Sequence, residues 1–567
     1  MLPFVLFAGL LNGQTLRAAA EPQPPAAKAA EVVTQEDTVI FKSKVNLVLV
    51  PVVVRDKSGK AVDNLRQQDF QLFDKGKPQV ISKFSIEKAG GKAIAKSPQA
   101  EAVPGETPAD APAIIAPDHF VALLFDDIHI DFANLVTIRD AAEKYIAASL
   151  KPADRVAIYT TSDRTSLDFT DNRDELHRTL LSLRPQPIAR TNAQECPDIS
   201  FFMADLIVNK NDDQALNASV IEVMGCQNIR ERPIAVGIAQ ADARRVLTQG
   251  EHETRVAMIS IKDVVRRMAL MPGQRTIVLA SPGFLRLTDQ FQDETAIIDQ
   301  AIRSNVVINS LDARGLYTNT PDISKRVINM ASEQVKQSIA RQAASVEADI
   351  LAELADGTGG TFVQNTNDLV SGMRELSAAP DVFYIVGFSP QNLKLDGNYH
   401  SLKVTVKIPP GLNVKARRGY YAPKHLSSAD EDAKEEISQA LFSRDEMRDI
   451  PVDLHTQFFK SSETEARLVV ISRLDVRKLH FKKADGRNND DVEIVSGLFD
   501  RNGNYLQSIT KTLKMRLFDA TLESKLNSGI SIRSDFKVAP GTYVIRLVVR
   551  DAEGQMMAAQ NGAVEIP

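Results

Sequence analysis

The chain has 567 residues, of which 43% are hydrophobic and 25% are charged, and its formal net charge at pH 7 is -5. This length predicts several domains, and the composition is that of an ordinary globular protein. The slightly acidic balance gives no support for nucleic-acid binding, which favours a basic face.

The first 20 residues have the outline of a secretory signal, with an apolar run over Leu2–Leu11 and an A-x-A cleavage site at Ala18–Ala20. One expected part is missing, because no Lys or Arg precedes the apolar run. No later stretch is long and apolar enough to span a bilayer. We therefore expect an exported protein in the periplasm, at the cell envelope or outside the cell. Residues 21–37 are rich in Ala, Pro and Glu and are expected to be disordered.

Two β-rich stretches predict small sandwich modules. Residues 38–88 contain short apolar strands separated by Asp- and Gly-containing turns, and residues 450–567 repeat this character. The fragments VVVRDKSGK and LVVRDAEGQ, one in each stretch, echo each other. This echo predicts two Ig-like β-sandwiches of one general type, although shared hairpin chemistry would also produce it. A low-complexity linker over 89–117 follows the first module, and a charged helical connector over 424–449 precedes the second.

Residues 118–423 alternate apolar strands with amphipathic helices, which predicts an α/β domain with a mostly parallel sheet covered on both faces. Residues 184–270 interrupt this alternation as an insertion that holds both cysteines, Cys196 and Cys226. Two thiols in an exported protein usually pair, so a Cys196–Cys226 disulfide is expected. The alternative is two unpaired buried thiols.

A cluster of charged residues follows the first strand of this domain, in the stretch VALLFDDIHIDFANL. Asp126 and Asp127 end the apolar run, and His129 and Asp131 follow at alternate positions. Ligands of open parallel sheets bind beyond the carboxyl ends of strands, where the strand order reverses. The cluster is therefore a candidate site.

The order of elements and this first loop resemble a von Willebrand factor A (VWFA) domain, and more closely the bacterial VWFA-related domain proteins of acidobacterial type. The resemblance covers about residues 38–423 and rests on a set of segments: VNLVLVPVVVRDKSGKAV, LRQQDFQLFDKGKPQVI, FVALLFDDIHI, MPGQRTIVLASPGF, LDARGLY, ILAELADGTGGTF, NTNDL, FYIVGFSP and VKARRGYYAP. It implies a doubly wound, mostly parallel sheet and a role in binding.

VWFA domains commonly bind a divalent cation through a first loop that reads D-x-S-x-S, a threonine from a second loop and an aspartate after the fourth strand. Hard cations such as Mg²⁺ and Ca²⁺ prefer such oxygen ligands. Asp126 matches the first position, but Ile128 and Ile130 replace the two serines, and Pro282 stands where the later aspartate belongs. The resemblance therefore implies a degenerate metal-ion-dependent adhesion site.

Two interpretations of the cluster remain open. In the first, Asp126, Asp127, His129 and Asp131 form an atypical cation site, because alternate residues of an extended segment share one side. Thr170 or Thr191 would then supply the loop threonine. In the second, Asp126 and Asp127 cap the following helix and order the loop through backbone N–H groups, with no cofactor.

Signs of catalysis are weak. Ser281 follows an apolar strand, but a nucleophile elbow needs the N–H of the next residue, and Pro282 has none. Gly357–Gly360 closes a helix and opens a strand, which is the wrong order for a phosphate loop.

The basic, aromatic patch Arg417–Tyr421 could bind a partner or an anionic glycan, but a final strand with its arginines paired on an exposed face is the simpler interpretation.

The sequence thus predicts an exported, non-enzymatic binding or adhesion-type protein. Its degenerate VWFA domain would bind a protein partner through Asp126, Asp127, His129 and Asp131, either around an atypical cation or as a direct acidic contact. The alternative is a structural or assembly component of the cell envelope, in which the VWFA domain is a spacer and the sandwiches make the contacts. Function does not follow from fold alone.

Overall fold

The computed structural model describes residues 31–37, 48–57, 60–88, 93–94, 114–188, 196–316, 329–378, 382–390, 398–407, 411–422, 429–443 and 446–567. The expected signal segment and most of the expected linker lie outside these ranges. Within them, no helix combines the length and the apolar character needed to cross a bilayer.

The first β module is built from two distant parts of the chain. Its strands are β2 (Val48–Arg55), β3 (Phe70–Asp74), β4 (Lys77–Gln79), β5 (Lys83–Lys88), β14 (Val382–Phe388), β15 (Tyr399–Val406), β16 (Asn413–Ala416) and β17 (Gly419–Tyr421). They form two four-stranded antiparallel sheets in the orders β16-β2-β14-β5 and β17-β15-β3-β4. The sheets share one core, in which Val50 and Val52 meet Phe70, Leu72 and Tyr384.

This arrangement corrects two predicted domain boundaries. Residues 382–421 do not belong to the α/β domain, as the sequence suggested, because their strands complete the sheets begun by residues 48–88. The physical reason is the edge of β2, whose backbone groups pair with β14 on one side and β16 on the other. The α/β domain is therefore inserted between the two halves of the first β module.

The α/β domain has a six-stranded sheet in the order β10-β9-β8-β11-β12-β13. Its strands are β8 (His119–Phe125), β9 (Asp154–Thr160), β10 (Ser166–Thr170), β11 (Gln274–Ser281), β12 (Val306–Asp312) and β13 (Phe362–Val363). All neighbours pair in parallel except β9 and β10. The chain leaves β8 toward β9 and later returns to its other side at β11, so the strand order reverses between β8 and β11.

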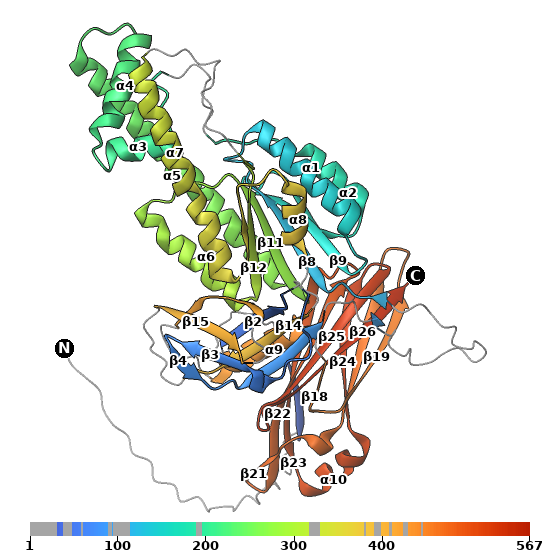
Figure 1. Ribbon diagram of the computed structural model, residues 1–567. Coiled ribbons are helices and arrows are strands. Elements are labelled where there is room, and N and C mark those ends of the chain that lie inside the picture. Colours follow the sequence, from blue (N-terminus) through green and yellow to red (C-terminus); the bar gives the residue numbers. More distant parts are fainter. Residues whose placement is uncertain are drawn as a thin grey trace, which may run out of the picture.

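Helices cover both faces of this sheet, which confirms the predicted α/β class (Figure 1). One face is covered by α1 (Phe132–Ser149), α2 (Arg173–Ser182) and α8 (Leu369–Ser377). The other face is covered by α5 (Arg232–Ala269), α6 (Phe291–Arg303) and α7 (Met330–Thr358). Because the strands are buried on both sides, β8 and β9 are buried along their whole length.

A helical arm, residues 196–250 with 329–343, rises beyond the carboxyl edge of the sheet (Figure 1). It contains α3 (Phe201–Val208), α4 (Asp213–Cys226) and the first halves of α5 and α7. The arm has its own apolar core. Cys196 and Cys226 are joined within it, with their Cα atoms 6.4 Å apart. The predicted insertion is thus a folded projection, and α5 alone is roughly 57 Å long at 1.5 Å per residue.

The C-terminal module also packs two sheets on one core. The larger sheet contains β1 (Val32–Asp37), β18 (Met447–Arg448), β21 (Lys482–Ala484), β22 (Arg487–Asp500), β23 (Tyr505–Leu517), β25 (Gly541–Asp551) and β26 (Met556–Ile566). The smaller contains β19 (Val452–Lys460), β20 (Ala466–Leu474) and β24 (Ile530–Val538). Helix α9 (Ala429–Leu441), in the predicted connector, packs on the larger sheet, and α10 (Asp519–Ser528) follows β23.

Two short segments differ from the sequence-based expectation. Residues 32–37 were expected to be disordered, but they form β1, which pairs antiparallel with β23. The edge of β23 supplies backbone partners that composition cannot reveal. Within the predicted linker, β6 (Ala93–Ile94) pairs with β7 (Ile114–Ile115).

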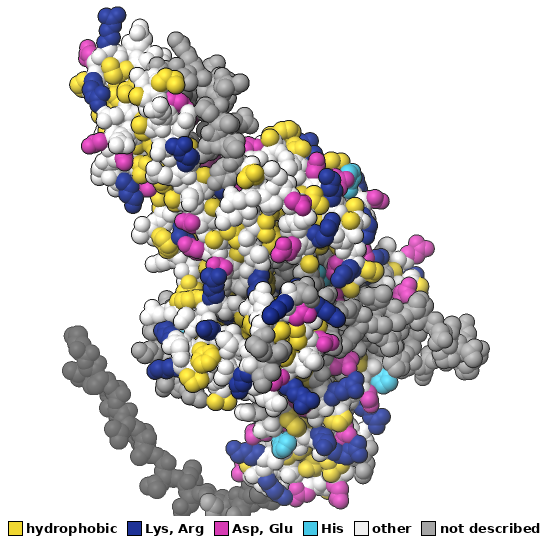
Figure 2. Space-filling view, viewed as in Figure 1, with side chains coloured by type: hydrophobic (Ala, Val, Ile, Leu, Met, Phe, Trp, Pro, Cys, Tyr) yellow, Lys and Arg dark blue, Asp and Glu magenta, His cyan; other side chains and the backbone are white. Residues whose placement is uncertain are grey.

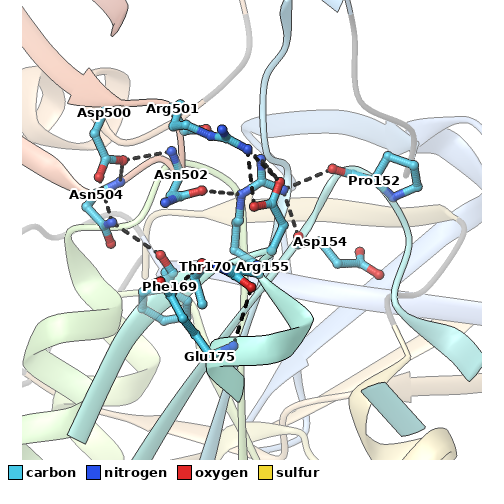
Figure 3. A network of polar contacts seen from close by, with 12 residues as sticks. Pro152, Asp154, Arg155, Phe169, Thr170, Glu175, Asp500, Arg501, Asn502 and Asn504 are labelled. Atoms are coloured by element: carbon cyan, nitrogen blue, oxygen red, sulfur yellow. Dashed lines mark hydrogen bonds and ion pairs between the residues drawn. The ribbon is translucent and has the colours of Figure 1, made fainter. Parts of the chain in front are cut away.

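A buried arginine attaches the α/β domain to the C-terminal module (Figure 3). Arg155, at the start of β9, is 4% exposed and donates hydrogen bonds to the carbonyls of Pro152 and Asp154 in its own domain. It also donates to Asn502 Oδ1 at 3.1 Å and to the Arg501 carbonyl at 3.4 Å in the β22–β23 hairpin. One side chain therefore satisfies acceptors from two domains.

The tip of the same hairpin packs onto the sheet itself. Gly503 has a φ of +81°, and a Cβ added to it would lie 2.6 Å from Cζ of Phe120 in β8. Asn504 donates to the Phe169 carbonyl at 3.3 Å. Only glycine fits this turn without strain, because both its φ and its close contact exclude a side chain.

Candidate functional site

The site lies at the reversal of strand order and centres on Asp126, the residue after β8. Its carboxylate has no solvent exposure. It accepts hydrogen bonds from Thr161 Oγ1 at 2.8 Å and Ser281 Oγ at 2.6 Å, and both its oxygens lie 2.9–3.0 Å from Nδ1 of His129. The ends of β8, β9 and β11 therefore meet on one carboxylate.

Asp127 is buried beside it, at 1% exposure. It accepts hydrogen bonds from the Ser162 backbone N–H at 2.9 Å, from Ser162 Oγ at 2.6 Å and from Thr161 Oγ1 at 3.2 Å. The Gln186 N–H donates to the Asp127 carbonyl, which brings the chain after α2 over this loop. Burial raises the pKa of Asp127, the hydrogen bonds from Ser162 oppose that rise, and the charge of Asp126 adds to it.

His129 forms an internal ion pair with Asp126. Its ring stacks on Phe284 with centroids 5.1 Å apart. Burial by itself would lower the pKa of His129, but the charge and hydrogen bond of Asp126 outweigh it and raise the pKa above 6.5, helped by Glu253 and Glu347. For Asp126 burial alone would raise the pKa, whereas His129 and the hydroxyls of Ser281 and Thr161 hold it below 3.8. Both shifts favour the charged forms of the pair, an imidazolium and a carboxylate.

Asp131 does not join the other three residues. It is exposed and is the N-cap of α1, where Oδ1 accepts from the Asn134 N–H at 2.8 Å and Oδ2 accepts from Asn134 Nδ2 at 2.6 Å. The interpretation that Asp126 and Asp127 cap this helix is therefore wrong, because Asp131 does so. The two buried aspartates instead bind the end of β9.

The residues present do not fit the divalent cation that the resemblance implies. Within the described ranges, no group of three or more His, Cys, Asp or Glu side chains is placed to hold a metal. The oxygens of Asp126 already accept from two hydroxyls and lie 2.9–3.0 Å from Nδ1 of His129. Ile128 and Ile130 are each 3% exposed and contribute no ligand atom. Thr170 lies apart from the cluster and bonds to the Asn172 N–H, and Thr191 lies outside the described residues.

The interpretation of the cluster as a direct acidic contact with a partner is also wrong for Asp126 and Asp127. Asp126 and Asp127 are 0% and 1% exposed, so an approaching protein cannot touch their carboxylates. They are buried because β9 and β11 supply enough hydroxyl and N–H donors to replace water around both carboxylates. Of the four predicted site residues, only Asp131 is freely exposed.

Three residues of the cluster were missed by the sequence analysis as partners: Thr161, Ser162 and Ser281. The signal that could have found them is the position of each hydroxyl at the carboxyl end of a predicted strand neighbouring the first. Ser281 was weighed only as a nucleophile. Its hydroxyl donates to Asp126, which stands between it and His129, whereas an activated serine needs the histidine as its own partner.

No family model matches the chain, and no curated protein matches it. One similar solved structure is an aerotolerance-related membrane protein from Bacteroides fragilis NCTC 9343 with multiple mutations to serines, at 11% identity and a TM-score of 0.23. Another is the conserved hypothetical protein BatB from Bacteroides thetaiotaomicron, at 11% identity and a TM-score of 0.22. Each match covers 46% of this chain and 96% of the other. A β-glucuronidase from Bacteroides uniformis matches at 11% identity and a TM-score of 0.15, over 34% of this chain and 20% of its own. These TM-scores are too low to carry an argument.

Proposed function

We propose that the chain is an exported, non-enzymatic protein that binds a protein partner through a degenerate VWFA-like domain, without a cation. In this proposal the domain is held between two β-sandwich modules. The doubly wound strand order and the candidate site at its reversal support the VWFA-like assignment. The two packed antiparallel sheets in each flanking module support the sandwich assignment.

The observation that carries the proposal is the ion pair between His129 and Asp126. A cation-dependent adhesion site needs an exposed ion with an open position for a partner's carboxylate. Here His129 of the chain itself lies 2.9–3.0 Å from both oxygens of Asp126, and the carboxylate is completely buried. The cluster then fixes the shape of the loops at the carboxyl edge and leaves recognition to the groups exposed around it.

Exposed apolar side chains at this edge form a suitable contact surface. Phe132 at the start of α1 is 61% exposed, Leu316 after β12 is 57% exposed, and Ile188 after α2 is 44% exposed. We call these three residues the edge surface. On the face seen in Figure 2, acidic and basic side chains are interspersed, with no broad area of one sign among the described residues. A mixed surface with exposed aromatic and aliphatic groups suits a protein partner.

Crosslinking in cells that express the full chain tests this proposal. The double variant Phe132→Ala/Leu316→Ala should lose at least 80% of the captured partner, whereas chelation of divalent cations by EDTA should change capture little. The matched control is Phe459→Ala/Leu506→Ala in the C-terminal module, where the two side chains are 55% and 47% exposed. Loss of capture on EDTA treatment would refute the cation-independent mode.

A second candidate is an envelope assembly component in which the VWFA-like domain is a rigid spacer. The observation that favours it is the Arg155 network with the hairpin contact of Gly503, which joins the domain firmly to the C-terminal module. In that case the Phe459→Ala/Leu506→Ala control loses the partner and the edge-surface variant keeps it. The same crosslinking experiment therefore separates the two functions.

A further inference from the structure

A large cavity lies at the opposite edge of the α/β sheet from Asp126. Its volume is about 2880 Å³, and it is lined by the amino-terminal ends of strands, including Asp118 and Gln274, together with the first β module and α9. One wall is the outer face of the β16-β2-β14-β5 sheet, and another is made by α6 and the C-terminal end of α7. Three parts of the chain therefore enclose it.

Arg417, the residue after β16, lines this cavity and is only 5% exposed. Within the described part of the chain, its Nε is buried without a hydrogen-bond partner. The simpler interpretation of the patch has both arginines paired on an exposed face. That is wrong for Arg417, whereas Arg418 is exposed and pairs with Asp356 at 2.9 Å.

The neighbouring charges do not neutralise Arg417 through contact. Burial lowers the pKa of Arg417 to about 9. Tyr399 and Asp299 oppose this lowering of the pKa, and the charge of Arg303 adds to it. Because the pKa stays above 7, the guanidinium remains charged at neutral pH. Asp299 is bonded to Arg303 at 3.0 Å. Lys415 is bonded to Thr361. Buried charges in proteins are normally paired or bound to a ligand, and a lone guanidinium beside a cavity fits an anion.

The outer face of the β16-β2-β14-β5 sheet brings apolar side chains to the same cavity. In the sheet register Lys415 pairs with Val53, Ala416 with Val52, and Ile385 with Pro51. Side chains alternate between faces, so Pro51, Val53 and Ile385 lie on the outer face of this sheet with Lys415. Arg417, just past the end of β16, lines the same cavity as Pro51 and Ile385. Val50, Val52 and Tyr384 point the other way, into the core.

We propose that Arg417 binds the carboxylate of an amphipathic ligand of the fatty-acid class, whose apolar body lies across Pro51 and Ile385. The guanidinium fork matches a carboxylate, and Pro51 and Ile385 give the aliphatic chain an apolar surface within the cavity lining. The cavity is far larger than this one ligand, and the remainder can hold water around the acidic groups that also line it, such as Glu435 and Glu375. The proposal is independent of the partner proposed for the carboxyl edge.

Calorimetric titration of the full chain with decanoate, acetate and inorganic phosphate tests the inference. Decanoate should bind at least tenfold more tightly than acetate or phosphate. Arg417→Met should raise the Kd for decanoate at least tenfold, and Ile385→Ser should raise it while leaving the head-group contact intact. The matched control, Arg418→Met, should stay within twofold of the unsubstituted chain.

Several outcomes would overturn the inference. One is the absence of binding heat when decanoate is titrated below its micelle concentration. The others are an unchanged Kd for decanoate in Arg417→Met, and phosphate or acetate that binds as tightly as decanoate. If Arg417→Met does not fold by circular dichroism, Arg417→Lys replaces it. A lysine keeps the charge but loses the bidentate fork, so Arg417→Lys should still raise the Kd for decanoate, and an unchanged Kd in that variant would overturn the inference.

Discussion

Replacing Asp126 tests whether the buried cluster is a closed internal ion pair. In Asp126→Ala, His129 loses its counter-ion, Ser281 loses the acceptor of its hydroxyl, and Thr161 keeps only its 3.2 Å hydrogen bond to Asp127. The carboxylate that is removed is fully buried. Removing one partner of a buried ion pair costs about 3–5 kcal/mol, and each hydrogen bond to a charged group contributes about 1.5–3 kcal/mol. Partial relaxation makes these terms overlap, so we expect a loss of about 4 kcal/mol.

Asp131→Ala is the matched control, because it removes an aspartate five residues away that only caps α1. Loss of such a cap costs about 1 kcal/mol. The whole chain has several modules, so a single unfolding midpoint is not a well-defined quantity. Hydrogen exchange of the β8 amides reports the α/β domain alone, and Asp126→Ala should accelerate it roughly a thousandfold relative to the unsubstituted chain.

The pH dependence follows from the two pKa shifts. The pKa of Asp126 is lowered, so its contribution is present above 3.8 and is lost as the pH falls through its folded value. The pKa of His129 is raised, so its contribution is fully present below 6.5 and is lost as the pH rises through its folded value. Protection of β8 should therefore be greatest between these limits, and His129→Gln should remove the alkaline decline.

Two results would refute this reasoning. One is a loss of β8 protection in Asp126→Ala that is no larger than the loss in Asp131→Ala. The other is stabilisation of the unsubstituted chain by millimolar Mg²⁺, Ca²⁺ or Mn²⁺ that disappears in Asp126→Ala, because a cation would then have displaced His129 from its carboxylate.

Three further predictions concern other parts of the chain. Burial and the neighbouring Asp551 carboxylate raise the pKa of Asp490 to about 8, so the folded state keeps a proton that the unfolded state releases above 3.8. The stability of the C-terminal module should therefore fall as the pH rises from about 4 to 8, by at most about 1.4 kcal/mol per pH unit, and Asp490→Asn should flatten that slope in hydrogen exchange of the β22 amides. Gly503→Ala should cost about 2–4 kcal/mol by hydrogen exchange of the β22 and β23 amides, from its positive φ and its contact with Phe120, and a neutral effect would show that the hairpin does not pack there. Removing the disulfide with Cys196→Ser/Cys226→Ser should cost the helical arm about 3–4 kcal/mol and speed its proteolysis, with β8 exchange unchanged; equal proteolysis of both forms would contradict this.

Local patterns in the sequence were sufficient for part of the structure. The alternation of apolar strands and amphipathic helices predicted the parallel sheet with helices on both faces, because burial on both sides demands continuous apolar strands. The position of Asp126 at the end of such a strand located the candidate site, since ligand sites of these sheets lie at strand ends. Both inferences depend on residues close together in the chain.

Only the tertiary structure decided which strands pair and which charges are buried. Tyr384 donates its hydroxyl hydrogen bond to the Val62 carbonyl, 322 residues away, so no local pattern could assign residues 382–421 to the first β module. The same holds for Thr161 and Ser281, which bury Asp126, and for the cavity that encloses Arg417. Side-chain type and spacing determine what a residue can do, but long-range packing determines whether water, a partner or another side chain reaches it.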